Sequence, residues 1–134
     1  TEGGALAKLL PPFRLGLGGP VAGGKQYVPW IHHADVTALY LRALDDDTWS
    51  GAYNATAPEP VTNRVFSKAL GAAVHRPAIT PVPGFALRAL YGEMADLITV
   101  SHHAVPARAT ATGHVFAHAD IGAALDDLLR KPPA

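Results

Sequence analysis

The chain has 134 residues, of which 49% are hydrophobic and 16% charged, and eleven basic residues balance eleven acidic ones. A chain this rich in apolar residues is not expected to be disordered, and its zero net charge argues against electrostatic binding to nucleic acid or to an anionic membrane. It has no cysteine, which excludes disulfides and thiolate metal sites and is compatible with a cytoplasmic location. Its length corresponds to one domain, and no apolar run approaches the roughly 20 residues of a transmembrane helix.

The chain begins with a short predicted helix and a glycine-rich loop. Residues 5–13 place leucines and Phe13 on one side of a helix, which Pro11 and Pro12 are expected to break or end. Residues 15–25 must form a loop because they are rich in glycine. The glycine spacing is similar to that of phosphate-binding turns, but a strand follows where a helix N-terminus would bind phosphate. No phosphate site is therefore predicted there.

The predicted strand and helix that follow are the most strongly patterned part of the chain. Residues 26–32 are rich in β-branched and aromatic side chains and predict a strand, which Pro29 restricts to a sheet edge or a bulge. Asp35 is interpreted as the N-cap of the next helix. That helix has one apolar face, formed by Val36, Leu39, Tyr40, Ala43 and Leu44.

The remainder of the chain alternates between predicted strands, turns and helices. Short strands are expected at residues 51–56 and 78–82. Thr62 or Asn63 is expected to cap a helix that reaches residue 73. Further helices are expected at residues 83–91, 93–100 and 120–129.

Several motifs resemble those of one protein family. The sequence Trp-Ile-His-x-x-Asp at residues 30–35 resembles the extended short-chain dehydrogenase/reductases, the NAD(P)-dependent sugar-nucleotide epimerase group. More narrowly, the chain looks like epimerase-like proteins that end in a small domain of uncharacterised role. Further matching residues are Asn54, Thr62, the Gly-Glu-Met-Ala of 92–95, Pro106, Arg108, Gly113 and Phe116. The resemblance covers nearly the whole chain, but only the C-terminal part of such proteins.

The resemblance implies an α/β fold, the C-terminal portion of a Rossmann-type extended reductase with short strands and four to six helices. Residues 1–76 are then expected to complete the Rossmann-type half, and residues 77–134 to form the small C-terminal subdomain. The N-terminal cofactor-binding half is expected to be absent from this chain. Its main expected partner is therefore that missing half of a longer parent protein.

The chemistry of the family uses a cofactor turn and a proton-transfer pair that this chain lacks. Members hold NAD or NADP on an N-terminal Gly-x-x-Gly-x-x-Gly turn, beside a Tyr-x-x-x-Lys pair. The residues four positions after the four tyrosines are Ile31, Leu44, Ala57 and Ala95, so no such pair is present. We therefore predict no catalytic and no cofactor-binding residue in this chain, while NAD or NADP is implied for the parent.

The substrate side is what the chain is expected to retain. The candidate binding residues are Lys25, Gln26, Tyr27, Trp30 and His32. Trp30 and His32 are alternatively packing residues, and this role is preferred because buried aromatic side chains usually serve packing before recognition. In nucleotide-sugar members an arginine stands where this chain has Val28, so the resemblance favours a smaller or unknown substrate.

The predicted function is the substrate-side region of an NAD(P)-dependent epimerase or oxidoreductase, not catalytic alone. The alternative is a non-catalytic interaction or assembly domain, with self-association through uncovered apolar faces as an option. The seven histidines include two adjacent pairs, His32–His33 and His102–His103, and one spaced pair, His114-x-x-x-His118. Without cysteine or a nearby glutamate, the histidine pattern predicts no metal site.

Overall fold

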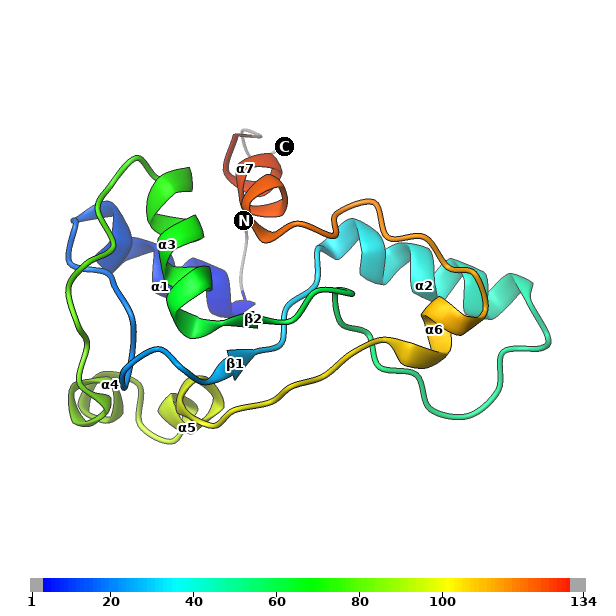
Figure 1. The fold of residues 1–134 in the computed structure, drawn as a ribbon, viewed down its shortest axis with the longest axis horizontal. Coiled ribbons are helices and arrows are strands. Elements are labelled where there is room, and N and C mark those ends of the chain that lie inside the picture. The colour runs from blue at the N-terminus through cyan, green and yellow to red at the C-terminus, as the bar shows by residue number, and fades with distance from the viewer. Residues whose placement is uncertain (1–3, 131–134) are drawn as a thin grey trace.

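The computed structural model describes residues 4–130, which contain seven helices and two short strands (Figure 1). In chain order these are α1 (Gly4–Arg14), β1 (Tyr27–Val28), α2 (His33–Asp45), β2 (Val61–Thr62), α3 (Asn63–Ala73), α4 (Gly84–Tyr91), α5 (Met94–Thr99), α6 (Ala107–Ala111) and α7 (Ile121–Arg130). The α/β class is confirmed. All six expected helices occur, and the five-residue α6 is additional to the expected four to six.

The first helix continues through the two prolines that were expected to break or end it. α1 contains Pro11 and Pro12 and ends only at Arg14. Leu10 and Phe13, on either side of the prolines, are both buried in the core. Packing of this apolar side holds the last turn in place, because tertiary contacts contribute more to helix stability than intrinsic propensity does.

The strands are shorter than the sequence pattern predicts. β1 pairs antiparallel with β2, with Tyr27 opposite Thr62 and Val28 opposite Val61. On its other side, the amide of Tyr27 donates to Ser101 Oγ and its carbonyl accepts from the amide of His102. The predicted strand at 78–82 contributes only an isolated parallel bridge between Val82 and Val21.

The predicted strand at residues 51–56 is wrong, because this segment is irregular in the structure. The guanidinium of Arg108 donates to the carbonyls of Ser50 and Ala52, both at 2.8 Å. Asn54 Nδ2 donates in turn to the carbonyl of Val105 at 3.2 Å. These side-chain contacts take up backbone carbonyls on which a neighbouring strand would depend.

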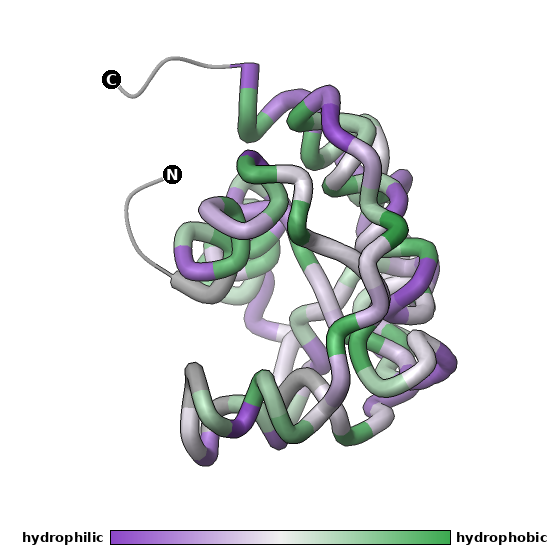
Figure 2. Tube along the Cα trace, turned by 90° about the vertical axis from the view of Figure 1, so that its left-hand side faces the viewer, coloured by the Kyte–Doolittle hydropathy of each residue, from purple (hydrophilic) through white to green (hydrophobic). Residues whose placement is uncertain are grey.

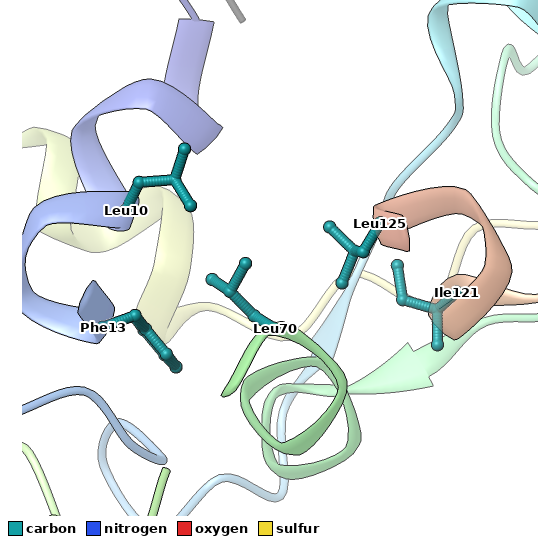
Figure 3. Close-up of a cluster of buried hydrophobic side chains, with 5 residues drawn as sticks. All are labelled: Leu10, Phe13, Leu70, Ile121 and Leu125. Carbon is teal, nitrogen blue, oxygen red and sulfur yellow. The ribbon is translucent and has the colours of Figure 1, made fainter. Parts of the chain in front are cut away.

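The main hydrophobic core joins helices from both ends of the chain. Its buried members are Leu10, Phe13, Leu70, Ile121 and Leu125, from α1, α3 and α7. Figure 3 shows Leu70 between the α1 side chains and those of α7. The last helix, which lies in the expected C-terminal part, thus packs against helices of the expected first part.

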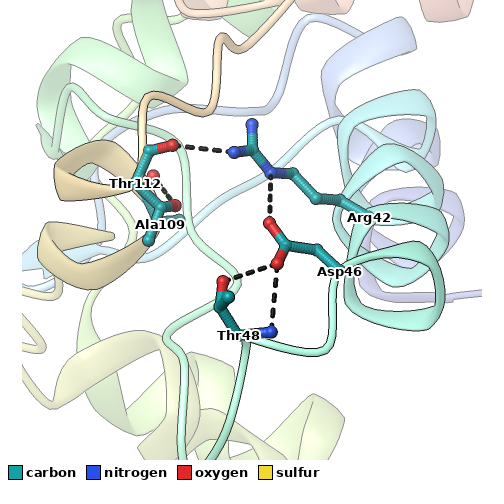
Figure 4. A network of polar contacts seen from close by, with 5 residues as sticks. All are labelled: Arg42, Asp46, Thr48, Ala109 and Thr112. Carbon is teal, nitrogen blue, oxygen red and sulfur yellow. Dashed lines mark hydrogen bonds and ion pairs between the residues drawn. The ribbon is translucent and has the colours of Figure 1, made fainter.

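The second helix lies apart from this core. In Figure 1, α2 and α6 occupy the opposite end of the long axis from α1, α3 and α4. Arg42 Nη2 of α2 donates to the carbonyl of Thr112 at 2.7 Å and so ties α2 to the end of α6 (Figure 4). Asp46 caps the end of α2 and accepts hydrogen bonds from the hydroxyl and the amide of Thr48. The Thr48 side-chain and backbone bonds lower the pKa of Asp46.

The expected apolar face of α2 is only partly covered. Leu39 is buried, whereas the Tyr40 side chain is 70% exposed and Leu44 is 79% exposed. Along the trace in Figure 2, hydrophobic and hydrophilic residues alternate within the helices. Among residues 4–130, no helix is long and apolar enough to cross a membrane.

Candidate functional site

One candidate site is an apolar pocket of about 480 Å³ between α1, the β1 segment, α3 and α7. Its wall includes Val28, Trp30, His32, Asn63 and Ser67. No lysine, arginine, aspartate or glutamate lines it among the described residues. A pocket of this size can hold a small organic ligand, and its wall provides no formal charge to bind a phosphate.

The polar side chains of the pocket wall bind the protein backbone. Asn63 Oδ1 accepts from the amide of Val21 at 2.7 Å, and Ser67 Oγ donates to the carbonyl of Gly19 at 3.3 Å. Asn63 and Ser67 are both buried. These bonds hold the glycine-rich loop against α3 and shape the wall of the pocket. Thr62 rather than Asn63 caps α3, accepting from the amide of Val65.

The structure separates the five predicted substrate-binding residues into two groups. Trp30 and His32 line the pocket, and the Trp30 indole N–H also donates to the carbonyl of Glu59 at 3.2 Å. Lys25, Gln26 and Tyr27 do not line it. Gln26 Nε2 instead donates to the carbonyl of Val21, and the Tyr27 ring packs edge-on against His103.

His32 lies at the point where α2, α7 and the segment before α7 meet. Its side chain is 1% exposed, and its Nδ1 caps α2 by accepting from the amide of Ala34 at 3.2 Å. Its Nε2 lies 3.4 Å from Asp127 Oδ2, and its ring stacks on that of His118 with centroids 3.8 Å apart. Burial lowers the pKa of His32, and the neighbouring His118 and His33 lower it further, against the opposing effect of Asp127 and Asp35.

The interpretation of Asp35 as the N-cap of α2 is wrong. His32 is the N-cap, and Asp35 lies within the first turn with only 1% of its surface exposed. Its Oδ1 accepts from the amide of Ala117 at 2.7 Å and its Oδ2 from the amide of His118 at 3.0 Å. The carboxylate therefore holds a distant segment against α2. No local pattern could have revealed this role, because the donors lie 82 and 83 residues further along the chain.

Sequence reasoning also missed the environment of His114. The ring of His114 is buried and packs edge-on against the ring of Phe116. The ring of Trp49 also lies edge-on to His114, with the two ring centroids 6.2 Å apart. Its Nε2 is buried without a hydrogen-bond partner. Burial lowers the pKa of His114, the charge of Arg42 lowers it further, and Asp35 opposes both effects.

Mild acid is expected to destabilise the chain partly through His114. Because its folded pKa lies below the ordinary value of 6.5, the unfolded chain binds the proton more readily. The His114 contribution is complete above about pH 6.5 and is lost as the pH falls toward the folded pKa, at a slope of at most about 1.4 kcal/mol per pH unit. Denaturant titrations at several pH values measure this slope.

The matched variant for this prediction is His114→Phe, which keeps an aromatic ring between Trp49 and Phe116 but cannot titrate. It should show a shallower loss of stability in acid than the native chain. A residual slope from His32, whose pKa is also lowered, remains in both proteins. An identical pH dependence of the two proteins would contradict the role assigned to His114.

Comparison with known proteins places the chain beside one family. Residues 82–128 match a family described as a domain of unknown function, DUF1731. Mouse epimerase family protein SDR39U1 is 43% identical over 95% of this chain, which covers 44% of the mouse protein. The chain therefore spans less than half the length of this relative.

Two crystal structures resemble the chain. The human epimerase family protein SDR39U1 (isoform 2) with NADPH matches with a TM-score of 0.90 and 37% identity, over 97% of this chain and 44% of the human one. A nucleoside-diphosphate sugar epimerase from Corynebacterium glutamicum matches with a TM-score of 0.72 and 31% identity, over 95% of this chain and 23% of that one. Over nearly its whole length the chain thus resembles the C-terminal part of epimerase family proteins such as SDR39U1.

Proposed function

We propose that this chain forms the substrate-side region of an NADP(H)-dependent epimerase or reductase and does not catalyse the reaction alone. The main support is the structural match to a human protein crystallised with NADPH. The match extends over 97% of this chain and covers 44% of the human protein. The rest of such a protein would supply the cofactor site and the proton-transfer pair. A cytoplasmic location is part of the proposal and rests on composition alone.

The glycine-rich loop of this chain does not fit the pyrophosphate of a dinucleotide. Several of its backbone amides are used within the chain: Val21 donates to Asn63, Ala22 to the carbonyl of Val82 and Gly24 to the carbonyl of Val21. A phosphate site needs backbone N–H groups that point free at a helix N-terminus. We therefore place no part of the pyrophosphate on this loop.

The pocket supports a substrate without a charged phosphate. Its described wall contains no Lys or Arg, and Val28, which lines it, stands where the resemblance implies an arginine in nucleotide-sugar enzymes. A diphosphate placed there would lose its hydration without gaining a charged partner. The substrate proposed for the parent is therefore a small, mainly apolar molecule.

Calorimetric titration tests this proposal. The longer parent protein is expected to bind NADPH with roughly micromolar affinity or better, whereas the 134-residue chain alone should bind neither NADPH nor NADH. UDP-glucose, as a nucleotide-sugar probe, should not bind the parent–NADPH complex. Binding of NADPH by the chain alone would refute the proposal that the cofactor site lies in the rest of the parent. Tight binding of UDP-glucose would refute the proposed class of substrate.

The second candidate is a non-catalytic interaction or assembly domain. The observation that favours it is the uncovered part of α2, where Tyr40, Leu41 and Leu44 are exposed. Beside it, Trp49 and Tyr53 stack and help to line a second hollow of about 220 Å³. A parent protein that binds no NADPH, together with concentration-dependent self-association in light scattering, would favour this candidate.

A further inference from the structure

Three potential metal ligands converge from separate parts of the fold. His32 precedes α2, His118 lies in the segment before α7, and Asp127 lies on α7 itself. One ligand atom of each residue lies within 4.8 Å of the others. The sequence pattern predicted no metal site, because it compared histidines within single stretches of the chain, whereas the fold brings His32, His118 and Asp127 together from separate stretches.

The separation of two of these atoms suits a tetrahedral ion. His32 Nε2 and Asp127 Oδ2 are 3.4 Å apart. Zinc binds histidine nitrogen and carboxylate oxygen at about 2.0–2.2 Å, so two ligands on a tetrahedral ion lie about 3.4 Å from each other. Independently, His32 Nε2 is buried and makes no hydrogen bond. An unsatisfied nitrogen beside a carboxylate and a second imidazole indicates a position for a ligand.

We propose that His32, His118 and Asp127 form a binding site for a divalent transition metal, with zinc as the best match. Two imidazoles and one carboxylate, with a fourth position left to water, are a common ligand set for this ion. The Asp127 side chain is 33% exposed, so an ion can reach the site from solvent. A bound ion links the start of α2 to α7 and to the segment between α6 and α7.

Metal binding carries two structural costs. His32 Nδ1 accepts from the amide of Ala34, so a metal on Nε2 moves the remaining ring proton to Nδ1 and removes this cap. The loss of a helix cap reduces affinity by about fivefold to tenfold, which is small beside the affinity of a typical zinc site. The stacked rings must also open, which the His118 side chain achieves by rotation while Asp35 holds its backbone amide.

The test is titration of zinc into the chelator-treated 134-residue chain, with heat and melting temperature as readouts. We expect one equivalent to bind and to raise the melting temperature, because an ion that binds only the folded state stabilises it. Cobalt in place of zinc should give the strong visible absorption of a tetrahedral site. Absence of binding at micromolar zinc would overturn the proposal.

Matched variants separate this site from accidental binding to surface histidines. Asp127→Asn should lower the affinity at least tenfold, whereas Asp126→Asn, at the adjacent position, where the side chain is 45% exposed and pairs with Arg130, should leave it unchanged. His32→Asn keeps a capping side chain on α2 while removing a ligand, and should also abolish tight binding. A double variant of His102 and His103 to Asn should bind zinc normally. Retained affinity in Asp127→Asn, or loss in the double variant, would refute the site.

Discussion

Replacing Asp35 by Ala is expected to destabilise the chain by roughly 2–6 kcal/mol, because two buried backbone N–H groups then lose their acceptor at about 1–3 kcal/mol each. Those donors are the amides of Ala117 and His118, at 2.7 and 3.0 Å from the carboxylate. Asp35→Asn keeps one acceptor oxygen and presents an NH₂ group to the other amide. This variant should therefore cost roughly 1–3 kcal/mol rather than being neutral.

The control for Asp35 is an aspartate that does cap a helix. Asp120 is exposed, and its Oδ1 accepts from the amide of Ala123 at 2.8 Å at the start of α7. Asp120→Ala should cost about 1 kcal/mol and Asp120→Asn almost nothing. Chemical denaturation of the four variants measures these differences. If Asp35→Asn were as neutral as Asp120→Asn, the two hydrogen bonds to the 117–118 amides would not carry the predicted energy.

The contrast between these two aspartates shows what local sequence reasoning can resolve. Both precede apolar helical patterns, so both match the same capping signal. At Asp120 the nearest free amides belong to the following helix, and the prediction of a helix start there is confirmed. At Asp35 the cap position is already taken by His32, a residue type outside the usual capping set.

Strands were harder to predict than helices for a related reason. A helix satisfies its own backbone, so apolar periodicity together with the capping residues located α3 and α7 closely. A strand needs a second strand to pair with, and the local sequence does not show which segment of the chain that is. At residues 50–52 the available partner was the Arg108 guanidinium, and no ladder formed.

The candidate site was predictable in part. Trp30 and His32 were selected from the β1 segment and do line the pocket. The opposite wall comes from α1 and α7, which are more than 100 residues apart in the chain. No sequence pattern predicted that these two helices contribute to the same wall. The same limitation concealed the approach of Asp127 to His32.

Leu70→Ala is expected to cost about 2–5 kcal/mol, a large share of the roughly 5–15 kcal/mol that stabilises a typical domain. Leu70 is 0% exposed and lies between Leu10 and Phe13 of α1 and Leu125 of α7 (Figure 3), so the cavity opens where both ends of the chain meet. Val65→Ala, at a position of α3 that is 48% exposed, should change stability by less than about 0.5 kcal/mol. Because helices from both ends of the chain share one core, the chain should unfold in a single cooperative transition. Leu70→Ala should lower the midpoint of this transition equally when it is measured by circular dichroism and by tryptophan fluorescence. Two separate transitions, with only one shifted, would show instead that the parts before and after residue 76 unfold independently.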